Sequence, residues 1–466
     1  MKKIFFVVAF FTTFFSFSQL EDDSVLELSE YLGYLKKYHP IIKQARLKTT
    51  EGEIKLLKAR GAFDPKIEVD YDKKKFKKKD YFDKLNASFK IPTWYGIEFK
   101  ANYEDNSGIF LNPELTVPEN GLYSAGVSIS LARGLLTNER MATLRMAKVY
   151  TRQAQADQQL AINDILYKAI DTYFEWLKSY QTQQTYQVFL RNASDRLRNV
   201  KNSFIQGDKP AIDTLEANIN LNSRILDLEK SKLMYIKSKL KLANFLWLQD
   251  NIPLELEDAI IPDVNTYTNI DSILELKTLD SNREIVNRHL KIQSLELKKE
   301  SLLIDKRLKL NNLLPKIDFN YNFITSKYQD ITNFDTSNYK AGLNVSVPLF
   351  LRKERSDLRL AKLKLKDMYF SIAANKVNLS NKINSIRNEI NSYENQTQLL
   401  GDLVDDYKRL VRAEERMFTL GEGSLFRINY REVKLIETQL KAIDTRYKYL
   451  NSKASLQRLI NNQSFN

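Results

Sequence analysis

The residue types that carry most enzyme and metal chemistry are scarce in this sequence. It contains two histidines, His39 and His289, and no cysteine. A thiol nucleophile, a disulfide framework and a cysteine metal site are therefore excluded. Neither histidine has a partner at metal-ligand spacing, and no glycine-rich phosphate loop, serine elbow or catalytic pair of carboxylates is recognisable. We expect no enzyme activity, no cofactor and no metal site, and a structural role for both histidines.

Lysine is the abundant chemically active residue, and the formal net charge is +14. An excess of positive charge can serve to bind nucleic acid, to bind anionic lipid, or only to keep the protein soluble. Without a nucleic-acid recognition motif we expect no nucleic acid partner. The densest run, Lys73–Lys79, holds six lysines around Phe76. It would attract phosphates of a membrane leaflet, although a solvated loop is the simpler interpretation.

Long helices must position most of the remaining charged side chains. Residues 138–205 and 353–420 contain no proline, and their only glycine is Gly401. Each run of about 68 residues predicts a helix of roughly 100 Å. Shorter helical patterns cover about 28–60, 212–248, 271–310 and 425–460.

Other segments alternate apolar and polar residues and therefore predict strands. They cover residues 66–71, 96–103, 127–131, 316–323 and 341–347, while residues 80–90 and 95–103 flank a turn and allow an additional hairpin. Alternation suits a barrel with lipid outside and water inside, but each segment alone also fits a half-buried strand of a soluble sheet. Strand edges cannot stay open in lipid. In a membrane, these few strands must therefore close with strands of other copies.

The helical and strand patterns occur twice in the same order. Residues 64–71 read DPKIEVDY and residues 314–321 read LPKIDFNY, and Gly207 and Gly421 follow the two long helical runs. An internal duplication fixes the architecture before any other inference. Two fused halves are therefore expected, rather than the three domains that length alone suggests.

The N-terminus has the features of a secretory signal. Lys2 and Lys3 precede an apolar run at 4–17, and Ser16 and Ser18 favour cleavage after Ser18. No later segment is long and apolar enough to cross a bilayer as a helix. We expect an exported chain whose membrane crossing, if any, uses strands.

Two heptad patterns follow the glycines, with alternating steps of four and three residues. They connect Leu215, Ile219, Asn222, Leu226, Glu229, Leu233, Ile236, Leu240 and Ala243, and then Asn429, Val433, Ile436, Leu440, Ile443, Tyr447, Leu450 and Ala454. Such a period predicts packing of each stripe against a partner helix. Asn222 and Glu229 interrupt the first stripe and are expected to be solvated or to set its register.

The order of these segments resembles the TolC-type outer-membrane efflux proteins over essentially the whole mature chain. The resemblance lies in YHPIIKQA at 38–45, LPKI at 314–317, VSVPLF at 345–350, and Phe204 to Gly207 followed by IDTLEA at 212–217. It implies a mainly α fold with a β-barrel part. Duplicated long helical hairpins would form a periplasmic α-barrel, and the strands would join a shared, trimeric outer-membrane β-barrel.

The same resemblance implies a function and a set of partners. The chain would be a homotrimeric channel in the outer membrane, in contact with its lipid and extending into the periplasm. It would act as the passive exit duct of a tripartite efflux pump or type I secretion system. A periplasmic adaptor and an inner-membrane transporter would be its partners.

The resemblance also divides the chain. The first half would comprise a signal peptide (1–18), a helical segment (19–62), strands (63–131) and a long hairpin (132–248) with its tip near 205–212. The second half would comprise a linker (249–270), a short helix (271–311), strands (312–350) and a hairpin with the C-terminus (351–466), its tip near 419–425. Family precedent implies four strands per subunit, whereas the additional hairpin before residue 103 allows six.

The expected sites lie at the two tips. C-cap glycines should end the long helices, and Ser424 can cap the next helix. Adaptor docking is expected at Gly207, Asp208, Gly421, Glu422 and Gly423, and the aperture candidates are Asp213, Glu216, Arg427 and Tyr430. The type member narrows its aperture with acids on the second tip. Arg427 and Tyr430 occupy those offsets here, so we expect Arg427 to pair with Asp213 or Glu216.

Two other classes of protein remain open at this point. A soluble periplasmic coiled-coil protein or pump adaptor would also need the long helices and heptads. A surface-acting enzyme is disfavoured by the residue inventory. Membrane fractionation separates the first class from a channel.

Overall fold

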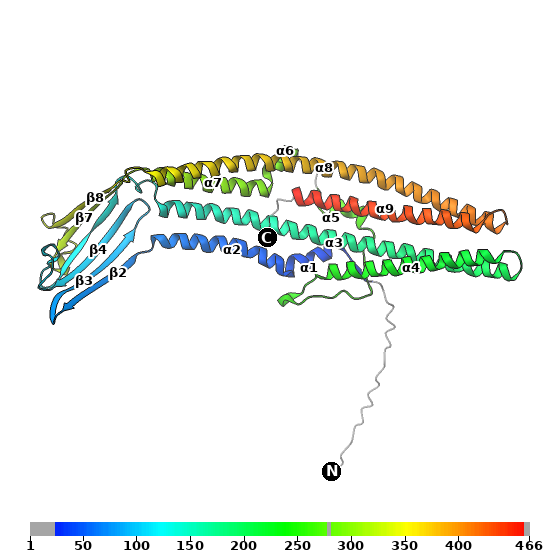
Figure 1. Ribbon diagram of the computed structural model, residues 1–466, viewed down its shortest axis with the longest axis horizontal. Coiled ribbons are helices and arrows are strands. Elements are labelled where there is room, and N and C mark those ends of the chain that lie inside the picture. Colours follow the sequence, from blue (N-terminus) through cyan, green and yellow to red (C-terminus); the bar gives the residue numbers. More distant parts are fainter. Residues whose placement is uncertain (1–23, 277–280, 461–466) are drawn as a thin grey trace, which may run out of the picture. The chain divides into compact units, whose positions relative to one another are not determined.

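A computed structural model describes residues 24–276 and 281–460 (Figure 1). The expected signal peptide lies outside the described residues. The described chain divides into two compact units: a tip unit of residues 24–40, 166–276 and 388–455, and a strand unit of residues 41–165, 281–387 and 456–460. The two longest helices, α3 (Glu139–Ile205) and α8 (Arg352–Thr419), contribute residues to both units.

The helices confirm the duplication. Helices α3 and α8 have 67 and 68 residues, α2 (Pro40–Arg60) and α7 (Leu290–Asn311) have 21 and 22, and α4 (Ala211–Ala243) and α9 (Leu425–Ile460) have 33 and 36. Short 3-10 turns lie at Gly61–Phe63, Pro113–Leu115, Gln249–Asn251 and Tyr328–Asp330. None of the described helices combines the length and the apolar composition of a membrane span.

Both histidines stand at the same kink of the two repeats. His39 separates α1 (Leu28–Tyr38) from α2 with φ −64° and ψ 128°, and His289 separates α6 (Asn282–Arg288) from α7 with φ −63° and ψ 131°. The prediction of single helices at 28–60 and 271–310 was therefore wrong, because an extended ψ interrupts the hydrogen-bond ladder of a helix. In the second repeat, α5 (Thr266–Ile273) is also separate from α6.

The tip unit has an aromatic core around Tyr173. Strands β1 (Ser24–Leu26) and β6 (Ile260–Pro262) pair in parallel beside it. The Tyr173 hydroxyl donates to the Leu26 carbonyl at 2.7 Å and accepts from the Asp263 N–H at 3.1 Å. Burial raises the pKa of Tyr173 to about 12. Its ring packs 5.8 Å from Tyr31 and 5.7 Å from Trp176, so long-range contacts hold β1 against α3.

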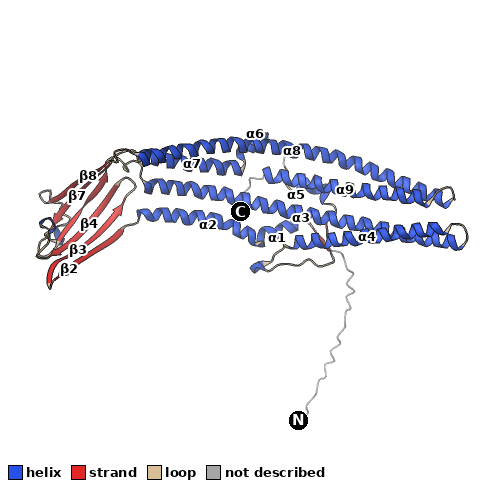
Figure 2. Ribbon diagram, viewed as in Figure 1, coloured by secondary structure: helices blue, strands red, loops and turns tan. Residues whose placement is uncertain are grey.

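The strand unit contains one antiparallel sheet of six strands (red in Figure 2). The strands are β2 (Lys66–Phe76), β3 (Lys79–Pro92), β4 (Ile97–Ser107), β5 (Leu122–Ser130), β7 (Lys316–Thr325) and β8 (Tyr339–Ser346), hydrogen-bonded in that order. Every predicted strand is present. Of the two strand numbers left open by the sequence, the sheet has six.

The two faces of this sheet differ as the alternation predicted. One row of paired residues across the strands is apolar: Ile67, Phe89, Ala101, Ala125, Phe323 and Tyr339. The next row, on the other face, is Lys66, Lys90, Lys100, Gly126, Asn322 and Lys340. Within the described residues, each of the outer strands β2 and β8 has a sheet neighbour on one side only.

Candidate functional site

Both hairpin tips of the tip unit are built in the same way. Gly207 has φ 82° and Gly421 has φ 80°, a left-handed conformation that glycine adopts without steric cost. At the first tip Gly207 N–H donates to Phe204 O at 3.0 Å and Asp208 N–H to Ser203 O at 2.9 Å. At the second, Gly421 N–H donates to Phe418 O at 3.2 Å and Glu422 N–H to Met417 O at 3.0 Å. These paired bonds are the Schellman pattern and confirm the predicted C-cap glycines.

The two tips pack against each other. Leu197, Val200 and Ala217 of the first hairpin form one buried cluster with Leu425 of the second. The Lys209 ammonium lies 4.2 Å from the centre of the Phe418 ring. The predicted docking turns at Gly207, Asp208, Gly421 and Glu422 remain exposed, and Gly423 is half-buried. We call these turns together the end surface of the tip unit.

The aperture candidates have different surroundings. The Glu216 carboxylate accepts a hydrogen bond from Asn429 Nδ2 at 2.9 Å. Arg427 is exposed, and its backbone N–H donates to Ser424 Oγ at 3.4 Å, which confirms the Ser424 cap. Tyr430 is exposed. Within one chain, the described residues include no ion pair between Arg427 and Asp213 or Glu216.

A buried ion network, which the sequence did not suggest, lies just behind the tips. Arg196 of α3 holds Glu432 of α9 with two parallel bonds of 3.0 and 3.1 Å, and it reaches Glu415 of α8 at 3.0 Å. Arg224 of α4 approaches Glu432 at 3.9 Å. The side chain of Glu432 is 1% exposed and that of Arg196 is 10% exposed. Glu432 thus joins α9 to α3 and α4, and Arg196 joins α3 to α8.

The physical state of this network follows from its partners. Burial disfavours the charged form of Arg196, but hydrogen bonds and charge from Glu432, then Glu415, outweigh it, so the pKa of Arg196 is raised. A charged pair buried in this way loses several kcal/mol when one partner is removed. The only signal in the sequence was the charged residues themselves, which are ordinarily solvent-exposed on helices.

The second predicted heptad stripe packs inside the chain. Ile436, Ile443, Leu450 and Ala454 of α9 are buried, and Leu440 packs beside the cluster of Phe189, Val411, Leu435 and Ile436. This confirms the packing predicted for the second stripe from Ile436 onwards, whereas its member Val433 is exposed.

The first predicted stripe lies on the exposed face of α4. Its apolar members Leu215, Ile219, Leu226, Leu233, Ile236 and Leu240 are 52% to 65% exposed. Another stripe with the same steps is buried or half-buried in the chain, at Ala217, Leu221, Arg224, Leu228, Ser231, Tyr235, Ser238 and Leu242. Helix α4 therefore has two packing faces, and only one of them is covered by described residues.

Helix α8 also carries an uncovered stripe in the tip unit. Leu399, Leu403, Ala413 and Met417 are exposed at heptad spacing, with half-exposed Leu410 between them; exposed Asp406 occupies the remaining heptad position. Single exposed apolar residues need no explanation, but exposed apolar residues repeated along one helix face mark an interaction surface. The tip unit thus presents two such stripes, one on each hairpin.

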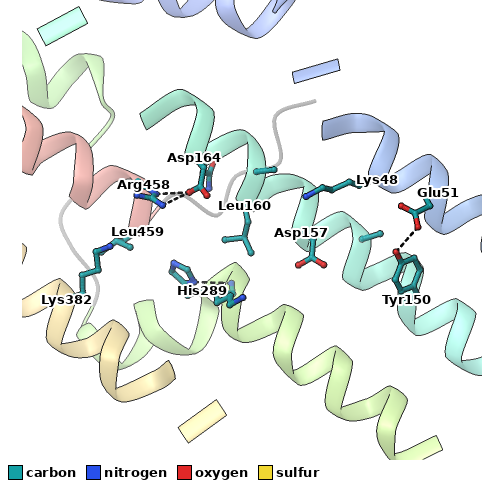
Figure 3. Close-up of a pocket in the computed structure, with 14 residues that line it drawn as sticks. Lys48, Glu51, Tyr150, Asp157, Leu160, Asp164, His289, Lys382, Arg458 and Leu459 are labelled. Atoms are coloured by element: carbon teal, nitrogen blue, oxygen red, sulfur yellow. Dashed lines mark hydrogen bonds and ion pairs between the residues drawn. The ribbon is translucent and has the colours of Figure 1, made fainter. Parts of the chain in front are cut away.

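The strand unit contains a cavity of about 550 Å³ between helices (Figure 3). Its charged lining includes Lys48, Lys291, Lys382, Arg458 and Asp164, and Arg458 pairs with Asp164 at 2.7 Å. His289 points into it, and its Nδ1 accepts from the Lys291 N–H at 3.0 Å (Figure 3). Burial, and then the charges of Arg458 and Lys382, lower the pKa of His289 to about 4. His289 is therefore a neutral helix cap at neutral pH.

In the described part of the chain, no three His, Asp or Glu side chains gather closely enough to hold a metal ion.

Several solved structures of known proteins have a fold similar to that of this chain. The fold is similar to the outer membrane channel CmeC of Campylobacter jejuni, with a TM-score of 0.65, 14% identity, and coverage of 93% of this chain and 85% of that chain. It is similar to VceC of Vibrio cholerae, with a TM-score of 0.66, 12% identity, and coverage of 93% and 95%. The sequence pattern of the family described as "Outer membrane efflux protein" matches residues 283–462. Part of the second half of the chain thus matches the outer membrane efflux protein family, and the chain has the fold of outer-membrane channels.

From this match and this fold, the protein is an outer-membrane efflux channel that extends into the periplasm, and it is a transport protein rather than an enzyme. Channels of the family are trimeric components of efflux pumps. A search of curated proteins by sequence gave no match. The soluble coiled-coil protein and the surface-acting enzyme considered above are thereby set aside.

Proposed function

We propose that three copies of this efflux channel chain close into one passive exit duct, serving a tripartite pump or a type I secretion system. The observation that carries the proposal is the set of uncovered surfaces in each unit. In the tip unit these are the stripes of α4 and α8, and in the strand unit they are the edges of β2 and β8.

Pairing unlike surfaces of neighbouring copies produces a closed ring. An α4 stripe that packs on the α8 stripe of the next copy gives a heterologous interface, which closes when the rotation is right. The six antiparallel strands alternate in direction, so β8 of one copy pairs antiparallel with β2 of the next. Three copies of six strands would give a barrel of 18 strands, an even number as bacterial outer-membrane barrels require.

Oligomeric state tests this arrangement. Leu226→Asp places a charge in the uncovered α4 stripe, where burial without a partner is costly. The matched control is Ser223→Asp, because Ser223 is exposed on α4 and lies outside both stripes. Native mass spectrometry in detergent should show trimers for the wild type and the control, and monomers for Leu226→Asp. A wild-type monomer that conducts ions in planar bilayers would refute trimeric closure.

The end surface of the tip unit is the proposed docking site for a periplasmic adaptor, which links the duct to an inner-membrane transporter. Exposed apolar side chains surround the docking turns, at Phe204, Ile205, Leu420 and Phe426. Such a patch, rimmed by Asp208 and Glu422, suits a helical hairpin partner. Phe426→Asp should abolish adaptor crosslinking and leave the trimer intact, whereas unchanged crosslinking would refute docking at this surface.

Arg427 is the proposed closing residue of the aperture. Since Glu216 is already bonded to Asn429, Asp213 of a neighbouring copy is the carboxylate we propose for it. Exposed pairs are weak, about 0–1 kcal/mol each, but three copies act on one aperture. Arg427→Glu should raise conductance in planar bilayers, and Asp213→Arg added to it should restore the wild-type value. Unchanged conductance in the single variant would show that Arg427 merely faces solvent.

A further inference from the structure

The hairpin between β2 and β3 carries a dense cluster of positive charge that the proposed channel function does not use. Six of the seven residues from Lys73 to Lys79 are lysines. Strand β2 ends at Phe76 and β3 begins at Lys79, so Lys77 and Lys78 form the turn.

This hairpin tip extends beyond the rest of the sheet. Pairing of β3 with β4 ends at Asp83 and Ser107, whereas β2 and β3 stay paired out to Phe76 and Lys79. The apolar face of β2 continues through Ile67 and Val69 to Tyr71, directly before the lysines. The lysine run therefore starts where the lipid-compatible face ends.

Aromatic side chains gather at the base of the tip. The rings of Tyr81 and Phe110 lie 4.6 Å apart, and those of Phe76 and Tyr81 lie 6.1 Å apart. Aromatic residues concentrate at membrane interfaces, where their apolar bodies meet the head groups. A membrane interface at these rings would place the lysines at the level of the lipid head groups.

The backbone of this turn has a conformation that lysine disfavours. Lys77 and Lys78 have φ values of 50° and 63°. Two consecutive positive φ angles in a two-residue hairpin strongly favour Asn-Gly, and lysine in the left-handed region is strained. Strain of this kind persists where a side chain is needed for function. Here that side chain is an ammonium group.

Most of these ammonium groups lack a carboxylate partner. Lys73 pairs with Asp83 at 2.7 Å and Lys75 with Asp80 at 3.6 Å. The other four are exposed, with no carboxylate within 4 Å among the described residues, at Lys74, Lys77, Lys78 and Lys79. The tip thus offers a local excess of positive charge to a ligand.

We propose that the β2–β3 tip binds the phosphate groups of outer-membrane lipids and so fixes the depth of the sheet in the leaflet. The inference rests on the membrane-embedded barrel described under the proposed function. The phosphate belongs to a lipid rather than to a free anion, because the lysines continue an apolar and aromatic strand face.

The test removes charge in two ways. Lys77→Asn with Lys78→Gly removes two ammonium groups and relieves the turn, and Lys77→Gln with Lys78→Gln removes the same charge without glycine. The matched control is Lys362→Gln with Lys364→Gln, two exposed lysines of α8. Each purified assembly is titrated with phosphatidylglycerol or phosphatidylcholine, and bound lipid is counted by native mass spectrometry.

Both hairpin variants should bind phosphatidylglycerol roughly 30-fold more weakly, at about fivefold per lysine removed. The control should bind as the wild type does, and only the Asn-Gly variant should show a higher thermal midpoint. Equal wild-type binding of both lipids, unchanged binding by the variants, or complete displacement by millimolar inorganic phosphate would each overturn the proposal. Because the proposal places the β2–β3 turn at the lipid head groups, outside the water-filled duct, the lysine variants should conduct ions normally. A wild type that does not conduct ions would count against the proposed function instead.

Discussion

Replacing Glu432 by Gln is expected to open the tip unit locally. Glu432 is the carboxylate that joins Arg196 to Arg224, and its side chain is almost fully buried. In the variant, Arg196 keeps Glu415 at 3.0 Å, and Arg224 keeps only Asp227 at 3.4 Å. Removing the Glu432 charge from these buried arginines should lower the stability of the tip unit by about 3 kcal/mol. Because the group is buried, solvent screening does not reduce this value much.

Native-state hydrogen exchange measures this cost where it arises. A loss of about 3 kcal/mol raises the exchange rate of α9 amides around Glu432 by roughly 150-fold, if they exchange by local opening. The matched control is Glu437→Gln on the same helix, because Glu437 is exposed and pairs with Lys434 at 2.8 Å. An exposed pair of this kind is worth about 0–1 kcal/mol. If the two variants exchange alike, within about fivefold, the network does not hold the four helices together.

Two further predictions concern the kinks and the tips. The pKa of His289 is about 4 in the folded chain against about 6.5 unfolded, so stability present above pH 6.5 is lost as the pH falls towards 4. The free energy of local opening at the start of α7, measured by hydrogen exchange, should therefore be about 3 kcal/mol lower at pH 4 than at pH 7. The variant His289→Asn retains a capping side chain and should remove this pH dependence. Gly421→Ala should destabilise the second tip by about 1 kcal/mol, because its φ is 80°. Gly401→Ala, inside α8 with open space around its Cβ, should stabilise the helix by up to about 1 kcal/mol; equal effects of the two changes on thermal midpoints would contradict the tip geometry.

The sequence alone was sufficient for features set by neighbouring residues. The absence of proline over 138–205 predicted α3, and alternation at 316–323 predicted β7. Gly207 and Gly421 predicted the helix ends, since only a left-handed residue closes the Schellman bonds. In each case hydrogen bonds and sterics within a few residues fix the outcome.

Features that depend on distant residues required the tertiary structure. The sequence selected the more apolar stripe of α4 as its packing face, but the chain covers the stripe with Ala217, Arg224 and Ser231 instead. Both stripes have heptad spacing, and the choice depends on which helix lies opposite. Arg196 and Glu432 likewise look like solvated helix residues until α3 and α9 are brought together. Burial and pairing are properties of two segments more than 200 residues apart, so no local pattern contains them.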